Sequence, residues 1–188
     1  MRLNICIYCS SSNHVEAGYF DVAEETGRLL AERRFTLVYG GGNVGLMGRM
    51  ARSVHAHGGQ VVGVIPEALK QREGVAYDVA DQLITTATMQ KRKAIMFTRA
   101  DAFMVLPGGF GTLEEFLEVL TLRQLGYHNK PIALVNTDGF YDPLLELFDH
   151  FFRERFAHKH SRAFYYIASD PEDALRHIEA YIAAHAEE

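Results

Sequence analysis

Cysteine is scarce in this chain of 188 residues. Its two cysteines, Cys6 and Cys9, have the Cys-x-x-Cys spacing that zinc sites and redox pairs use. No second such pair accompanies them, and two positions three apart along a strand point to opposite faces of the sheet. Thiols that face apart cannot bridge to each other or chelate one ion. We therefore interpret both cysteines as reduced packing residues.

Familiar motifs for metals and nucleophiles are also missing. The chain has no His-Glu-x-x-His and no Gly-x-Ser-x-Gly, and neither of its glycine-rich loops ends in Gly-Lys-Ser/Thr. The sequence therefore predicts no metal site and requires no organic cofactor. The histidines are expected at the surface, namely His55, His57, His150, His158 and His160.

Long apolar runs and a basic charge excess are absent as well. No run approaches the roughly 18 residues of a membrane span, and the net charge is −5 with a pI near 6.0. This charge argues against non-specific binding to nucleic acid. Residues 1–6 lead directly into a strand without a separate apolar leader, so we expect a cytoplasmic protein. Residues 1–188 are expected to form one domain.

Short aliphatic runs alternate with amphipathic stretches of helical length. Runs without strict polar alternation are typical of strands covered on both faces. The alternation predicts an α/β fold with a doubly wound, mostly parallel sheet in three αβα layers. Residues 66–88 are the least regular and are expected to form a loop over the site. The predicted strands are Leu3–Tyr8, Thr36–Tyr39, Gln60–Ile65, Ala102–Leu106 and Ile132–Val135, and the predicted helices are Val15–Arg33, Gly45–His57, Met89–Arg99, Thr112–Leu125, Asp142–Arg155 and Pro171–Ala184.

Three loops follow predicted strands, where ligands bind in open α/β sheets. The first, Cys9–Asn13, reads by itself as a turn and helix cap. The second, Tyr39–Gly48, matches G-x-G-x-x-G but belongs to the second βα turn, whereas the dinucleotide fingerprint belongs to the first. Glu67 follows this loop at about the sequence separation at which dinucleotide-binding proteins have the acid that binds the ribose. A cofactor role for the loop therefore stays open.

The third loop, Pro107–Glu115, combines glycines with a hydroxyl, Thr112, at the start of a helix. Such a loop can hold an anion against the helix N-terminus. The helix that follows has leucine or phenylalanine at the positions of a buried stripe: Leu113, Phe116, Leu117 and Leu120. Glu115 is expected opposite that stripe and is our candidate catalytic acid, whereas Glu114 reads as a solvated acid near the helix N-terminus.

The segment Met89–Lys93 places three consecutive cations at the start of a helix, against the helix dipole. Arg92 shares a helix face with Met89 and Met96, so we expect its guanidinium to be partly buried. A guanidinium held there would suit a phosphate or a substrate hydroxyl. The conflict with the dipole favours a functional role.

Together these motifs resemble the LOG family of cytokinin-activating phosphoribohydrolases, whose members older annotation often named lysine decarboxylases. Pro107–Glu115 matches P-G-G-x-G-T-x-x-E, and Gly40–Gly48 matches G-G-G-x-x-G-L-M-G. The resemblance covers nearly the whole chain. It implies a modified Rossmann sheet, a homodimer, and hydrolysis of a nucleoside 5′-monophosphate, such as AMP or N6-prenylated AMP, to free base and ribose 5-phosphate.

By the same resemblance, Arg92 and Glu115 form the catalytic pair. Gln90 stands where the family commonly has histidine, and Ser10 where it often has glycine. Two rival functions are a non-catalytic nucleotide or cofactor carrier and a pyridoxal-phosphate decarboxylase. The residues expected to contact the nucleotide are Ser11, Gly41, Gly42, Glu73, Lys93, Gly108, Gly109, Phe110, Gly111, Thr112, Leu113, Glu114 and Thr121.

Overall fold

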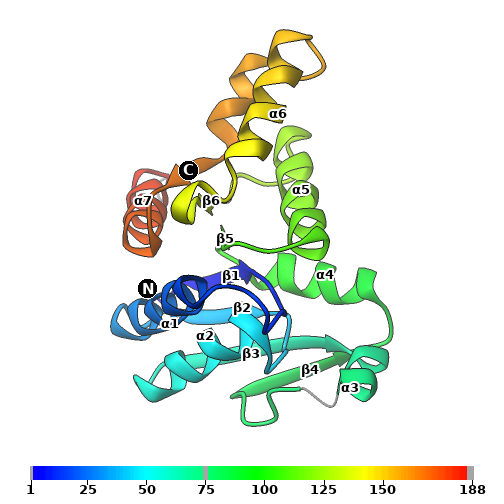
Figure 1. The fold of residues 1–188 in the computed structure, drawn as a ribbon, viewed down its shortest axis with the longest axis vertical. Helices are drawn as coiled ribbons and strands as arrows, with labels where there is room; N and C mark the ends of the chain where they lie inside the picture. Colours follow the sequence, from blue (N-terminus) through cyan, green and yellow to red (C-terminus); the bar gives the residue numbers. More distant parts are fainter. Residues whose placement is uncertain (1, 74–75, 186–188) are drawn as a thin grey trace.

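A single seven-stranded sheet forms the centre of the molecule (Figure 1). The computed structural model describes residues 2–73 and 76–185. The strand order is β4-β3-β2-β1-β5-β6-β7, and every neighbouring pair is parallel. The predicted doubly wound sheet is therefore confirmed. The strands are β1 (Asn4–Tyr8), β2 (Thr36–Tyr39), β3 (Gln60–Pro66), β4 (Gln82–Thr86), β5 (Ala102–Val105), β6 (Ile132–Val135) and β7 (Tyr166–Ala168).

Helices cover both faces of this sheet (Figure 1). One apolar cluster joins the sheet to α1, α2 and α7, and a second joins its other face to α4, α5 and α6. Cys6 belongs to the second cluster and Cys9 to the first, both as free, buried thiols, as predicted. The helices are α1 (Ala17–Glu32), α2 (Gly45–Ala56), α3 (Glu67–Glu73), α4 (Met89–Arg99), α5 (Phe110–Gln124), α6 (Asp142–Arg153) and α7 (Pro171–Ala184), with 3₁₀ turns at Thr137–Gly139 and Lys159–Phe164.

The two outermost strands were missed by sequence reasoning. Both β4 and β7 are only partly buried, because an edge strand has a neighbour on one side alone. Their residues therefore lack the continuous apolar run that marks the central strands. The expected loop over residues 66–88 was wrong in this respect, since it contains α3 and β4. No helix in the described residues is long and apolar enough to cross a membrane.

The buried face of α5 differs from the predicted stripe. Its buried residues are Thr112, Glu115, Phe116, Val119 and Arg123, whereas Leu117 is 39% exposed. The apolar pattern predicted the wrong buried face because two charged side chains, Glu115 and Arg123, occupy the inner face of α5. Glu115 thus lies inside the protein, and the leucines lie towards the flank.

Candidate active site

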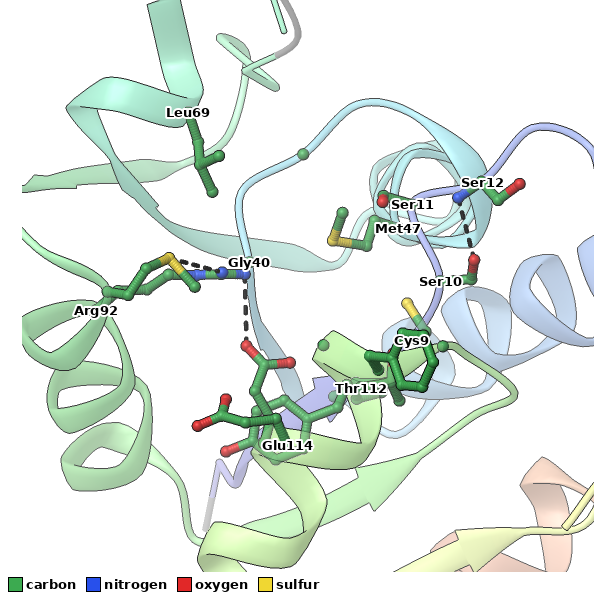
Figure 2. A pocket seen from close by; sticks show the side chains of 18 of the residues that line it. Cys9, Ser10, Ser11, Ser12, Gly40, Met47, Leu69, Arg92, Thr112 and Glu114 are labelled. Carbon is green, nitrogen blue, oxygen red and sulfur yellow. Dashed lines mark hydrogen bonds and ion pairs between the residues drawn. The ribbon is translucent and has the colours of Figure 1, made fainter. Parts of the chain in front are cut away.

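Three loops meet at the carboxyl edge of the sheet, where β1 lies between β2 and β5. The direction of strand order changes at β1, and such switch points are where open α/β sheets bind ligands. A cavity of about 450 Å³ opens between these loops (Figure 2). It is lined by Ile7, Tyr8, Cys9, Ser10, Ser11, Ser12, Gly40, Gly42, Met47, Ile65, Leu69, Met89, Arg92, Gly109, Phe110, Gly111, Thr112, Glu114 and Glu115.

Arg92 enters the cavity from the first turns of α4 and is buried. Its Nε donates a hydrogen bond to the backbone oxygen of Val64 at 3.1 Å, which fixes the plane of the guanidinium. A Cβ atom on Gly40 would collide with that guanidinium. A side chain at position 40 would therefore displace the guanidinium, so the position of Arg92 depends on glycine at residue 40.

Glu115 forms an ion pair with Arg92, its Oε1 lying 3.6 Å from Nη2 of the arginine. The carboxyl is only 9% exposed. Burial raises the pKa of Glu115 from 4.5 to about 7, and the attraction of Arg92, which lowers the pKa, offsets only part of that rise. Near neutral pH the carboxyl is therefore able both to accept and to release a proton, as a general base or acid requires.

The N-terminus of α5 forms another wall of the cavity. Gly109 is its N-cap, and no side chain of the described residues caps the helix. A Cβ on Gly109 or Gly111 would meet no atom within 4 Å, so protein packing does not explain these two glycines. A helix start with bare N–H groups and close backbone access is suited to an anion such as phosphate.

The N-terminus of α2, in the second glycine loop, is occupied by the protein itself. The backbone nitrogen of Gly45 donates to Oδ1 of Asn13 at 2.8 Å, and the backbone nitrogens of Leu46 and Met47 donate to the backbone oxygen of Ser10 at 3.0 and 3.3 Å. Glu67 is exposed and lies outside the cavity lining. The dinucleotide interpretation of this loop therefore loses its support, and of these two helix N-termini that of α5 is the one left without a side-chain cap from the described residues.

Comparisons with known proteins show which family the chain belongs to. A family model described as "Possible lysine decarboxylase" matches residues 47–178. The cytokinin riboside 5′-monophosphate phosphoribohydrolase LOG2 of Arabidopsis thaliana is 44% identical over 181 residues, which cover 96% of this chain and 84% of that protein. The chain belongs to the LOG family. The enzyme named LOG from Oryza sativa is 45% identical over 178 residues, which cover 95% and 73% of the two chains.

Solved structures share the LOG-family fold at low identity. The molybdenum cofactor binding protein of Rippkaea orientalis superposes with a TM-score of 0.73 at 23% identity and covers 97% of this chain and 98% of its own. The molybdenum cofactor carrier protein of Chlamydomonas reinhardtii also gives 0.73, at 20% identity, and covers 97% and 99%. These likenesses support the three-layer fold and nothing further.

Most of the residues that the LOG resemblance implies do line the cavity. Lys93 instead lies outside the lining and pairs with Glu114 and with Glu118, the latter at 2.7 Å. The remaining exceptions are Gly41, Gly108, Leu113 and Thr121, which lie outside the lining, and Glu73, the last residue of α3, whose side chain falls outside the described residues. Those that line it are Ser11, Gly42, Arg92, Gly109, Phe110, Gly111, Thr112, Glu114 and Glu115.

Several lining residues were not predicted. Leu69 comes from α3, the helix that sequence reasoning missed, and Tyr8 is the last residue of β1. Position at the carboxyl end of a central strand was the available signal for Tyr8. Met47 and Met89 stood inside the quoted motifs but had no role assigned to them.

One histidine also departs from the expected surface location. His55 is half-buried, with Nδ1 2.7 Å from the hydroxyl of Tyr77 and Nε2 3.0 Å from Oδ2 of Asp81. The backbone nitrogen of Tyr77 donates to the backbone oxygen of Gly41 at 3.0 Å. His55 therefore helps to hold the second glycine loop in place through its contact with Tyr77.

Proposed function

We propose that this chain hydrolyses the N-glycosidic bond of nucleoside 5′-monophosphates, such as AMP or the cytokinin riboside 5′-monophosphate in the names of its relatives. The products are the free base and ribose 5-phosphate. The observation that supports this most is the buried Arg92–Glu115 pair beside the uncapped N-terminus of α5. An anion position and a carboxyl with a pKa raised to about 7 then face the same cavity.

In this proposal the 5′-phosphate binds the N–H groups of residues 109–112 and is held by the helix dipole. Thr112, whose side chain lines the same cavity, adds a hydroxyl donor. Binding energy from the phosphate positions the ribose carbon C1′ near Glu115. Since the phosphate takes no part in bond breaking, its contribution is orientation.

Bond cleavage moves the C1′–N electron pair onto the base and leaves oxocarbenium character on the ribose, as in glycoside hydrolysis. The ionised Glu115 stabilises that positive charge and accepts a proton from the attacking water. The oxygen of the water bonds to C1′, and the proton that Glu115 took from the water passes to the departing base, which returns Glu115 to its ionised form. Arg92, fixed by Val64 and Glu115, orients the ribose or stabilises the charge on the leaving base.

The cavity wall beyond this pair is apolar. Met47, Ile65, Leu69 and Met89 line it. Thioether and aliphatic side chains accommodate a planar base and an apolar substituent through contact area rather than through hydrogen bonds. This wall supports a purine leaving group, including an N6-substituted adenine.

A carrier of nucleotides or cofactors is the second candidate, because the structural neighbours are named as molybdenum cofactor proteins. The two functions differ in turnover. Purified protein should be incubated with a panel of nucleoside monophosphates while released base and ribose 5-phosphate are measured. A carrier binds one equivalent tightly and releases nothing, whereas the proposed hydrolase releases base continuously.

The decarboxylase named by the family model requires a lysine for a Schiff base with pyridoxal phosphate. Among the described residues no lysine lines the cavity, and Lys93 is held outside it by two carboxylates. This argues for the hydrolase. An absorbance spectrum of the purified protein tests it, because bound pyridoxal phosphate absorbs visibly.

We further propose a cytoplasmic homodimer without affinity for nucleic acid. α5 and the residues directly after it expose three large apolar side chains, Leu117, Leu125 and Tyr127, at 39%, 64% and 72%. Exposed apolar groups of this kind favour association with another chain. α4 and α5, the helices of the catalytic pair, are the proposed interface elements.

A further inference from the structure

Met89, the first residue of α4, lies at the mouth of the cavity beside Arg92. Its Sδ accepts a hydrogen bond from Nη1 of the arginine at 3.8 Å. Met89 is 40% exposed. Of the other methionines in the described residues, Met50, Met96 and Met104 are fully buried and Met47 is half-buried. Met89 is therefore the most exposed methionine of the described residues.

The two cysteine thiols do not compete for an oxidant. Cys6 and Cys9 are both buried. Burial raises the pKa of Cys6 to about 12 and also raises that of Cys9, so both remain protonated at neutral pH. The thiolate is the form that reacts with peroxides. These cysteines are therefore protected from oxidation both by their burial and by their raised pKa.

We propose that Met89 is a site of reversible oxidation to methionine sulfoxide, and that the sulfoxide oxygen accepts a hydrogen bond from Arg92 and slows catalysis. This rests on the proposed function only in giving Arg92 a catalytic role. The oxidant is a hydroperoxide, such as hydrogen peroxide. The sulfur lone pair attacks one peroxide oxygen, the O–O bond breaks, an S–O bond forms and water leaves. Sulfur loses two electrons and the peroxide gains them.

The consequence follows from the change in acceptor strength. A thioether sulfur accepts hydrogen bonds weakly, whereas oxidation converts the side chain into a polar one. An oxygen bonded to Sδ and angled off the line to Nη1 can lie closer to Nη1 than the present 3.8 Å, within the normal hydrogen-bond distance of about 2.7–3.2 Å. It would then compete with the substrate for Nη1, whereas Glu115 faces Nη2 of the same guanidinium. A charge-assisted hydrogen bond of this kind should lower kcat/KM for AMP by about tenfold or more.

The test treats the purified protein with graded hydrogen peroxide and follows two readouts. Peptide mass mapping measures which methionine gains an oxygen, and base release from AMP measures activity. We expect Met89 to be oxidised before Met47, activity to fall in proportion to Met89 oxidation, and methionine sulfoxide reductase with a dithiol to restore it. Met89→Leu, compared with its own untreated activity, should resist peroxide, whereas the matched Met47→Leu should remain sensitive.

Met89→Gln provides a second test without oxidant, because its amide oxygen imitates the polar sulfoxide beside Arg92. It should be less active than Met89→Leu. Complete oxidation of Met89 without loss of activity would overturn the proposal, and so would equal peroxide sensitivity in Met89→Leu. Untreated protein that releases no base from AMP would contradict the proposed function instead, while the order of oxidation would still test Met89.

Discussion

Replacing Glu115 by glutamine should remove activity and stabilise the protein at alkaline pH. The carboxyl is buried, and burial raises its pKa from 4.5 to about 7. Each unit of such a rise corresponds to about 1.4 kcal/mol, so ionised Glu115 costs the folded state roughly 3 kcal/mol. The attraction of Arg92 at 3.6 Å is already included, because it lowers the same pKa.

The sign of the pH dependence follows from proton binding. Below pH 4.5 the carboxyl is protonated in the folded and unfolded chain alike, and it costs nothing. Between 4.5 and about 7 the unfolded chain ionises while the folded chain keeps its proton, so the free energy of unfolding falls as pH rises. Above that range the loss is complete. Glutamine does not ionise, so the Glu115→Gln variant does not lose this part of the free energy of unfolding.

Urea denaturation at pH 5 and pH 8, followed by circular dichroism, measures this difference. The stability of Glu115→Gln relative to the wild type should increase by about 2 kcal/mol between the two pH values. The matched control is Glu114→Gln, since Glu114 is exposed and paired with Lys93. It should show no such increase. A Glu115→Gln variant with a constant stability difference, or with wild-type turnover, would refute the reasoning.

Other perturbations test separate parts of the site. Arg92→Ala should lower kcat/KM for AMP and adenosine alike, by about 100-fold or more in steady-state assays, because the arginine faces Glu115 rather than the α5 N-terminus. The kcat/KM of the wild type should rise with pH through about 7, as the pKa of Glu115 requires of a base. Gly40→Ala should lower the melting temperature, and lower it less in an Arg92→Ala background, because the added Cβ collides with the guanidinium. Light scattering should report twice 21.2 kDa, or a multiple of it.

The central fold could be predicted because its signals are local and mutually consistent. The five inner strands are short apolar runs followed closely by turn residues, and β1, β2, β3, β5 and β6 were found at nearly their observed bounds. Edge strands β4 and β7 lacked that signal since partial exposure relaxes the apolar pattern. Their existence depends on pairing with β3 and β6, which one strand's sequence does not reveal.

The loops that form the site could be predicted from the sequence, but the packing of their residues against one another could not. Glycine patterns located the N-terminus of α5, and the basic run at the start of α4 located Arg92. The glycine patterns did not distinguish glycines that face a ligand from one that accommodates an arginine. Gly40 is explained only by the guanidinium packed against it, and the anion role of α5 only by the bonds that occupy the α2 N-terminus. Those facts arise from tertiary contacts between distant segments.

The most direct test of the account compares the kcat/KM of AMP with that of adenosine. Both share the base and the scissile bond, and only AMP has the group that the α5 N-terminus would hold. Losing charge-assisted hydrogen bonds of about 1.5–3 kcal/mol each should cost several kcal/mol in transition-state binding. We therefore predict that base is released from AMP at least ~100-fold more efficiently, at about 1.4 kcal/mol per factor of ten. Comparable values for the two substrates would contradict phosphate anchoring.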